Sequence, residues 1–260
     1  MTTTMNDKWL KPLLLALAIL PIAACADSEQ APQAPTAQQQ AAPQQAKIAS
    51  NQATEAKPAA KREFSEDVHY VELFDPVPTN VAPGKIEVVE MFWYSCPHCY
   101  QMEPELEQWK KGLPGDIEVV QIPAVFKDRA GKPNPAWALS ARAYYALEAL
   151  GKARELHPRI FAAIHEQGRR LNSVDAFARF VASQGVDEQK FRDAMSSLAV
   201  ETKMRKAIEL TEKYGLTGVP ALIVDGRYRV LNKAIGSYGE MFQIVDYLAD
   251  KERSRLKKGG

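Results

Sequence analysis

Beyond about residue 64, apolar positions recur with two periods, one typical of strands and the other of helices. The segments 86–93 (IEVVEMFW) and 117–124 (IEVVQIPA) are short apolar runs rich in β-branched residues. The first indicates a strand buried on both faces, and the second indicates another central strand. Between them, residues 99–111 carry apolar residues at helical spacing, and Pro104 inside this segment predicts a kink. A strand, a helix and a strand in this order predict a βαβ unit with parallel strands.

The middle of the chain, from residue 135 to 214, shows only the helical period. Glycines and capping residues bound the repeats of this pattern, as Ser173 does at one start and Gly185 at one end. We expect helices over residues 135–150, 157–167, 173–184, 187–198 and 201–214. The first four of them predict a helical block between two parts of a sheet.

Strand patterns flank this helical region on both sides. Residues 221–224 and 227–230 are separated by Asp225-Gly226, a pair that favours a type I′ turn and therefore predicts a β-hairpin. Near the start of the ordered part, residues 68–73 (VHYVEL) are typical of a short edge strand.

The last predicted helix begins at Ser237, and Glu240 completes a capping box three residues later. The chain therefore predicts an α/β fold in which a helical domain interrupts a small sheet. The boundaries that we expect are 63–126 for the first part of the sheet domain, 127–200 for the inserted helical domain, 201–255 for the second part of the sheet domain and 256–260 for a disordered tail.

The N-terminus has the pattern of an export signal. Two lysines precede an apolar run over residues 13–24, which is shorter than the ~20 residues of a membrane span. The run ends in Ile22-Ala23-Ala24-Cys25, which resembles the lipobox of bacterial lipoproteins. We therefore expect a signal peptide over residues 1–24 and lipidation of Cys25. The alternative is an ordinary signal-peptidase site followed by an incidental cysteine.

Composition separates this N-terminal region from the rest of the chain. Residues 26–62 are rich in Ala, Gln and Pro and hold almost no large apolar residue, so together with Cys25 they predict a disordered tether over 25–62. The net charge of +1 offers no electrostatic footprint for nucleic acid. The chain has neither a GxGxxG nor a GxxxxGK[ST] motif, which argues against nucleotide binding.

Two of the three cysteines, Cys96 and Cys99, lie one helical turn apart, where the first buried strand gives way to its helix. A structural zinc site takes four ligands, usually as two paired half-sites, and this chain has one CxxC and no HxxxH, so we expect no metal. A structural disulfide across so short a loop removes little chain entropy from the unfolded state. A redox-active pair is the interpretation that best fits the placement.

Residue chemistry around the pair supports this interpretation. Pro97 suits the first helical position, which places Cys96 at the helix N-terminus, where free N–H groups and the helix dipole favour a thiolate. Cys99 would then be shielded and would resolve a mixed disulfide on Cys96. His98 is expected to stabilise the thiolate further, and stabilising the reduced form makes a disulfide a stronger oxidant. The pattern predicts thiol–disulfide exchange with the cysteine pair as the redox group and no separate cofactor.

The segments VVEMFWYSCPHCYQMEPEL and GLTGVPALIVDGRYRV resemble the DsbA family of periplasmic thiol–disulfide oxidoreductases, and the resemblance covers about residues 64–253. It implies a thioredoxin fold interrupted by a helical domain, with Cys96 as the exchanging nucleophile and Cys99 as its buried partner. It also implies that Pro220 is a cis-proline facing the disulfide and that Val219 offers backbone groups to an extended substrate. Valine before this proline is similar to the oxidases, whereas isomerases and reductants more often carry threonine.

Two acidic residues also match positions of the family. Glu90 shares a strand face with apolar residues, so it is either solvated at a gap in the cover or buried with a shifted pKa. The matching acid of the family lies near the cysteines and is thought to help move protons. Glu103 is expected to be a solvated helix residue.

The resemblance implies an oxidase that donates the Cys96–Cys99 disulfide to unfolded exported proteins with free thiols. A DsbB-like, quinone-linked membrane partner would reoxidise it, and lipidated Cys25 would anchor it to a bacterial membrane in the periplasm. The chain shows no dimerisation domain before the catalytic part, which favours a monomer. The alternatives are a membrane-tethered reductase or isomerase and a non-redox, peptide-binding chaperone.

Overall fold

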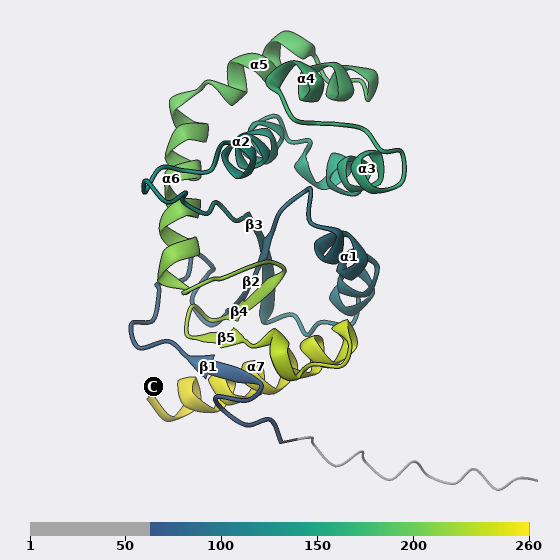
Figure 1. Ribbon diagram of the computed structural model, residues 1–260. Coiled ribbons are helices and arrows are strands. Elements are labelled where there is room, and N and C mark those ends of the chain that lie inside the picture. Colours follow the sequence, from purple (N-terminus) through teal and green to yellow (C-terminus); the bar gives the residue numbers. More distant parts are fainter. Residues whose placement is uncertain (1–62, 260) are drawn as a thin grey trace, which may run out of the picture. The chain divides into compact units, whose positions relative to one another are not determined.

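The computed structural model describes residues 63–259 (Figure 1). The predicted signal peptide over residues 1–24, the predicted lipidation site Cys25 and the predicted tether over 25–62 therefore lie outside the described residues. Among residues 63–259, no helix combines the length and the apolar character that a membrane span requires.

The strands of the described part form one mixed sheet in the order β1-β5-β4-β2-β3. They are β1 (Tyr70–Glu72), β2 (Ile86–Phe92), β3 (Ile117–Pro123), β4 (Ala221–Val224) and β5 (Tyr228–Val230). β2 and β3 run parallel, in register from Ile86 opposite Ile117 to Phe92 opposite Pro123, and the other neighbours are antiparallel. The predicted βαβ unit and the α/β fold class are confirmed.

Helices cover both faces of this sheet because the central strands are apolar on both sides. On one face, Ile86 and Val88 of β2 pack with apolar residues of α1 (Pro97–Lys110) and α7 (Tyr238–Gly259). On the other face, Val89 and Met91 pack against the C-terminal half of α6 (Leu198–Lys213). Pro104 is accommodated inside α1, which continues through it to Lys110. Glu90 belongs to the face that α1 covers, since side chains alternate along a strand.

The predicted helical block is present between β3 and β4. It consists of α2 (Pro135–Ala149), α3 (Ala153–His165), α4 (Val174–Ser183), α5 (Glu188–Met195) and the N-terminal half of α6. In Figure 1, α6 runs past both the helical block and the sheet. The predicted boundary at residue 200 therefore falls inside one continuous helix, whose first turns complete the core of the block and whose last turns complete the core of the sheet.

Two helices begin earlier than the sequence predicts. α3 begins at Ala153 and not at 157, and Pro158 lies inside it. Proline marks helix starts in sequence patterns, but α3 continues through Pro158, and the turns on either side of this proline bury Leu156 and Ile160. α6 begins at Leu198, three residues before the prediction, because Ser197 caps it: its hydroxyl accepts a hydrogen bond from the Val200 N–H at 3.3 Å.

The C-terminal tail differs from the prediction as well. α7 continues to Gly259, so residues 256–259 are helical where the sequence predicts disorder. Leucine, lysine and arginine are good helix formers, and Lys257 and Lys258 lie in the last turn, where the negative end of the helix dipole favours cations. The prediction of a disordered tail over 256–260 was therefore wrong for residues 256–259.

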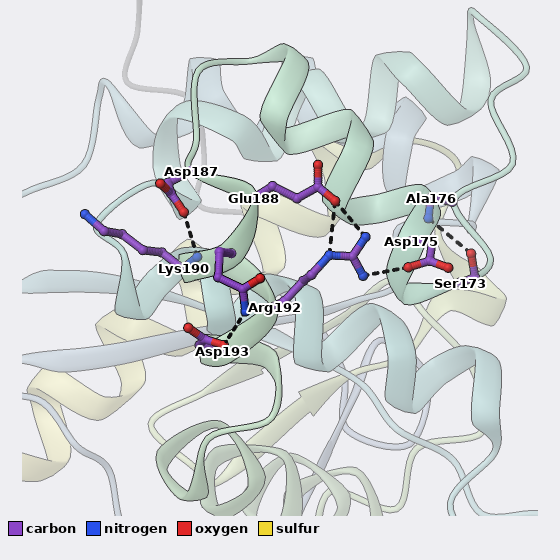
Figure 2. Close-up of polar contacts among 9 residues, drawn as sticks. Ser173, Asp175, Ala176, Asp187, Glu188, Lys190, Arg192 and Asp193 are labelled. Carbon is purple, nitrogen blue, oxygen red and sulfur yellow. Dashed lines mark hydrogen bonds and ion pairs between the residues drawn. The ribbon is translucent and has the colours of Figure 1, made fainter.

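An arginine links the two short helices at the far end of the block (Figure 2). The Arg192 guanidinium in α5 donates to Asp175 in α4 at 2.6 Å and to Glu188 in its own helix at 2.7 Å. Ser173 and Asp187 cap α4 and α5 through hydrogen bonds to the backbone N–H groups of Ala176 and Lys190. These contacts join α4 and α5 well away from the cysteines, so we assign them a structural role.

The hairpin turn between β4 and β5 contains the tightest glycine position. Asp225 and Gly226 both have positive φ, 52° and 58°, as the predicted type I′ turn requires. The Gly226 carbonyl accepts a hydrogen bond from the Val77 N–H at 2.8 Å, and a Cβ at Gly226 would lie 1.9 Å from the Val77 carbonyl oxygen. Gly226 thus satisfies both a backbone conformation and a close approach.

We expect Gly226→Ala to lower the free energy of unfolding by roughly 3 kcal/mol or more, since left-handed strain adds to a backbone clash. Gly84→Ala is the matched control, because Gly84 also has positive φ, 83°, but its Cβ would meet open space. We expect a loss of about 1 kcal/mol there. Denaturant titration of both variants measures the difference, and equal losses would contradict the steric argument.

Candidate active site

The two cysteines lie at the junction between the end of β2 and the start of α1. Cys96 has extended backbone angles (φ −84°, ψ 116°) and caps the helix, and its sulfur accepts a hydrogen bond from the Cys99 N–H at 3.4 Å. Pro97 occupies the start of the helix, where its missing N–H leaves no hydrogen bond unmade. Both residues are free thiols, Cys96 with 7% of its surface exposed and Cys99 with none.

Hydrogen bonds toward the Cys96 sulfur lower the pKa of this thiol to about 6. The largest cause is the hydrogen bond from the Cys99 thiol, followed, against the opposing effect of burial, by the backbone N–H groups of Cys99 and His98. The charge of the His98 ring adds a smaller effect in the same direction. His98 itself is exposed, so the helix N-terminus and Cys99 stabilise the thiolate more than the histidine does.

The same arrangement acts on Cys99 in the opposite direction. Burial raises the pKa of the Cys99 thiol far above its usual range, and the hydrogen bond to Cys96 and the neighbouring Cys96 thiolate add to this effect. The charge of Glu90 contributes as well. One cysteine is therefore ready to react as a thiolate, and the other holds its proton until a base removes it.

A second chain segment closes over Cys96. The Val219–Pro220 peptide bond is cis, as the resemblance implies, and the Cys96 thiol donates to the Val219 carbonyl at 3.5 Å. The Asn232 side chain holds this segment by donating to the Pro220 carbonyl at 2.9 Å. A cavity of about 590 Å³ adjoins it, with a lining that includes His98, Val219, Pro220, Ile235, Tyr238 and Met241.

Polar side chains gather beneath the cysteines, on the α1 face of the sheet. Glu90 is fully buried, and its Oε2 accepts a hydrogen bond from the Gln121 amide at 2.7 Å. Burial and the nearby Glu103 carboxylate raise the pKa of Glu90 to about 8. Glu103 is only 8% exposed and lies 3.1 Å from Nε2 of His157, which comes from α3. The expectation that Glu103 is a solvated residue was wrong, because α3 covers this part of α1.

These side chains also raise the question of a metal ion. Ligand atoms of Glu90, Glu103 and His157 lie within 4.8 Å of one another, close enough for a divalent cation to bridge them. However, the Gln121 amide nitrogen lies between them, 2.7 Å from Glu90 and 3.0 Å from His157. An amide N–H pointing into the set repels a cation and favours shared protons, so the chemistry of the donors supports proton transfer over metal binding.

Comparison with known proteins agrees with this geometry. Residues 87–248 match the model of the DSBA-like thioredoxin domain. The chain is 39% identical to the thiol:disulfide interchange protein DsbA of Pseudomonas aeruginosa over 196 residues, which cover 75% of this chain and 89% of that protein. It is 42% identical to the Pseudomonas syringae protein of the same name over 188 residues, 72% of this chain and 84% of the relative.

Solved structures show the same likeness. The crystal structure of Pseudomonas aeruginosa DsbA superimposes with a TM-score of 0.68 at 39% identity, covering 75% of this chain and 97% of that one. The oxidoreductase NmDsbA1 of Neisseria meningitidis gives 0.63 at 28% identity, covering 74% and 96%. The chain belongs to the DsbA family. Its thioredoxin fold with a helical insertion and its activity as a protein disulfide oxidoreductase follow from this membership.

The family motifs and the structure bring together Cys96, Cys99, Val219 and Pro220, which the sequence singled out. Sequence reasoning missed the contribution of Gln121, Tyr94 and His157 to the site. Gln121 and His157 lie outside the quoted family segments, Tyr94 lies inside one of them without having been singled out, and His157 is 54 residues from Glu103 along the chain. The pairing of β3 with β2 places Gln121 beside Glu90, and the packing of α3 on α1, which no local pattern reports, places His157 beside Glu103.

We expect the Cys96 thiolate to form with a midpoint near pH 6 when the reduced protein is titrated and followed by its ultraviolet thiolate absorbance. Cys99→Ala removes the largest stabilising contact and should raise this midpoint by about 1 to 2 pH units, the value of one hydrogen bond to a charged group. His98→Ala should raise it by less. A larger effect of His98→Ala would contradict the order of causes given above.

Proposed function

We propose that this protein donates its Cys96–Cys99 disulfide to exported proteins that fold in the periplasm. The observation that carries the proposal is the contrast between the two thiols. Because the Cys96 pKa is lowered to about 6, the reduced pair is stabilised as a thiolate, and a stabilised reduced form makes the disulfide a strong oxidant. The cysteine pair is itself the redox group, so the reaction needs no further cofactor.

The reaction has two exchange steps. A substrate thiolate attacks the Cys96 sulfur, the Cys96–Cys99 bond breaks, and Cys99 leaves with the bonding electrons and takes up a proton. A second substrate thiolate then attacks the substrate sulfur of the mixed disulfide, and Cys96 leaves as a thiolate. The substrate loses two electrons and gains a disulfide, and the cysteine pair gains those two electrons.

Access to the sulfur explains the proposed direction of attack. Cys96 retains some exposure whereas Cys99 has none, so an incoming thiolate reaches Cys96 first. The Val219 carbonyl lies beside the Cys96 sulfur, and the cavity of about 590 Å³ extends from Val219 and Pro220. We propose that an extended substrate segment pairs with the backbone at Val219 and places its apolar side chains in this cavity.

Glu90 is proposed to exchange a proton with Cys99. Its charge acts on the Cys99 thiol, and its own pKa is raised to about 8, within reach of the ambient pH. A group of this kind takes a proton from Cys99 during reoxidation and returns one when Cys99 leaves as a thiolate.

The reduced pair must be reoxidised for turnover. We propose a DsbB-like membrane partner for this step, and a lipid on Cys25 that holds the protein, as a monomer, at a bacterial membrane in the periplasm. The second candidate function is a membrane-tethered reductase or isomerase. Val219 weighs against it because the resemblance associates threonine at this position with those activities. A non-redox chaperone would not need the pKa of the Cys96 thiol to be lowered while that of the Cys99 thiol is raised.

We expect the full chain carrying Cys25→Ser to equilibrate with glutathione buffers at a potential more positive than about −180 mV, the value typical of disulfide isomerases. The preference for the reduced form should weaken as the pH falls through about 6, because the Cys96 thiolate that stabilises it becomes protonated. A potential close to that of thioredoxin, about −270 mV, would contradict the oxidase and favour the tethered reductase.

Lipidation has its own test. In a bacterial host fed labelled palmitate, the wild-type chain should incorporate label and sediment with the membranes. Cys25→Ser should abolish both, since the thiol is the acceptor of the lipid, while exchange activity at Cys96 remains. Release of an unlabelled wild-type protein into the soluble periplasmic fraction would favour the ordinary signal-peptidase site.

A further inference from the structure

The buried polar cluster contains one group that the redox chemistry described above does not use. His157 is almost fully buried, and it comes from α3 of the inserted block, not from the thioredoxin part of the chain. Its ring packs edge-on against Phe92 and Phe161, with centroids 4.8 and 5.0 Å away. These aromatic walls fix the ring plane and leave its two nitrogens to point at polar partners.

Each nitrogen of the ring has a defined neighbour. Nδ1 lies 3.1 Å from the Tyr94 hydroxyl. Nε2 lies 3.0 Å from the Gln121 amide nitrogen and 3.1 Å from Oε1 of Glu103. Since the same Gln121 nitrogen donates to Glu90 at 2.7 Å, one amide connects the histidine to the acid nearest Cys99.

The donors and acceptors at Nε2 allow two arrangements that differ by the place of one proton. When Nε2 is unprotonated, it accepts from the Gln121 amide, Nδ1–H donates to Tyr94, and Glu103 pairs with Nε2 only if Glu103 carries a proton. When that proton crosses the 3.1 Å contact, Nε2–H donates to the Glu103 carboxylate, and Gln121 keeps its bond to Glu90. The contact is thus suited to passing a proton between Glu103 and His157.

Glu90, the acid whose charge acts on the Cys99 thiol, has one carboxylate oxygen without a hydrogen-bond donor in the described part of the chain. Among the described residues, its Oε1 receives no hydrogen bond from any N–H or O–H group, although it is fully buried. The Glu103 carboxylate is its neighbour: ligand oxygens of the two acids lie within 4.8 Å of each other, and the charge of Glu103 helps to raise the pKa of Glu90. A proton held by Glu90 relieves the repulsion between two buried negative charges at this distance.

The outer end of the cluster reaches water. A cavity of about 940 Å³ lies between α1, β3, α2 and α3, and Glu103, Gln121 and His157 line it together with the charged side chains of Lys110 and Arg154. Glu90 and Cys99 do not line this cavity. A proton from Cys99 therefore reaches solvent on this side by way of Glu90 and the two titratable groups of the cluster that line the cavity, Glu103 and His157.

We propose that His157 is the outer member of a proton relay that runs from Cys99 through Glu90 and Glu103 to this cavity. The inference deepens the proposed function and rests on it, because the relay matters only if Cys99 changes its protonation during the redox cycle. His157 acts through the two acids and touches neither sulfur, so it is a positioning residue for the proton and not a catalytic one.

The step that needs the relay is resolution of a mixed disulfide on Cys96. The Cys99 thiol gives its proton to Glu90, and the resulting thiolate attacks the Cys96 sulfur. The Cys96–Cys99 bond forms, and the leaving group departs as a thiolate with the electrons of the broken bond. The proton then passes from Glu90 to Glu103, on to Nε2 of His157 and into water, so that Glu90 can accept a proton again.

Several titratable or charged groups surround the ring and the acids. Glu103 of α1 faces it directly, Tyr94 precedes the cysteines, and Tyr144 of α2 lies with its ring centroid 6.0 Å away. Lys110 acts on Glu90 by its charge. Removing the imidazole takes away the proton acceptor that contacts Glu103, so Glu90 should keep its proton to a higher pH.

The test uses the full chain carrying Cys25→Ser, in which Cys96 and Cys99 are the only thiols. Mixing the reduced protein with dithiobis(nitrobenzoate) releases one chromophore when Cys96 attacks and a second when Cys99 displaces the first mixed disulfide. The second phase reports deprotonation of Cys99. We expect His157→Gln to slow the second phase about tenfold at neutral pH and to shift its pH profile upward by about one unit. The first phase should keep its wild-type rate.

Two further variants separate a relay from a packing defect. His165→Gln is the matched control, because His165 lies on the same helix and bonds the Tyr94 carbonyl at 2.9 Å but does not contact the acids. We expect it to leave the second phase unchanged. In His157→Ala, added imidazole should enter the open cavity and restore the second phase in proportion to its concentration, an effect that no packing role produces.

The outcomes are distinct from those that decide the oxidase. A wild-type second phase in His157→Gln, an equal slowing of both phases, or a slowed His157→Ala variant that does not respond to imidazole would each overturn the relay. Failure of the oxidase proposal would show instead in the glutathione equilibrium, whatever the rate of the second phase.

Discussion

The hydrogen bonds that converge on the Cys96 sulfur are the interaction on which the rest of the site depends. They arise because β2 ends and α1 begins within four residues, so that a side chain at the helix cap faces backbone N–H groups that have no partner inside the helix. The parallel pairing of β2 with β3 and the cover of α1 and α7 hold this junction in place. A thiolate at this cap is stable only while the strand and the helix keep their relative position.

Stabilising the Cys96 thiolate leaves Cys99 as the cysteine that has to lose and regain a proton during the redox cycle. Cys99 lies in an interior with no exposed surface, where ionisation without help is unfavourable. The proton acceptor that we propose for Cys99 is Glu90, which lies on an otherwise apolar strand face. Its position requires a carboxylate to be buried beside α1. Glu90 is tolerated because Gln121 donates to one of its oxygens and because its pKa, raised to about 8, lets it hold a proton. A protonated Glu90 carries no charge, so the cost of burying it beside Glu103 falls.

The sequence predicted the elements well where one local signal dominates. The buried strand β2, the Ser173 cap and the Asp225-Gly226 turn were each correct because period, capping or turn chemistry acts over a few residues. The run 117–124 was predicted as a second central strand, but β3 lies at the edge of the sheet and most of its side chains are only half-buried. The prediction failed where packing overrides local preference, as at Pro158 inside α3 and in the helical end of α7. In the site, the CxxC and Val-Pro motifs located both reactive segments. The surroundings of Glu103 were predicted wrongly because its cover comes from a helix more than fifty residues away, for which a single sequence carries no register.

The helical insertion therefore does more than enlarge the core. It meets the thioredoxin part on the side of α1 and β3, where it supplies His157 to the acids and closes a cavity around them. The opposite approach to the cysteines, at Val219 and Pro220, belongs to the thioredoxin part alone. In the proposed mechanism, substrate and proton thus reach the cysteine pair from different directions, through surfaces formed by different parts of the chain. The substrate surface that we propose could then accept varied partners without disturbing the residues that we propose to handle the Cys99 proton.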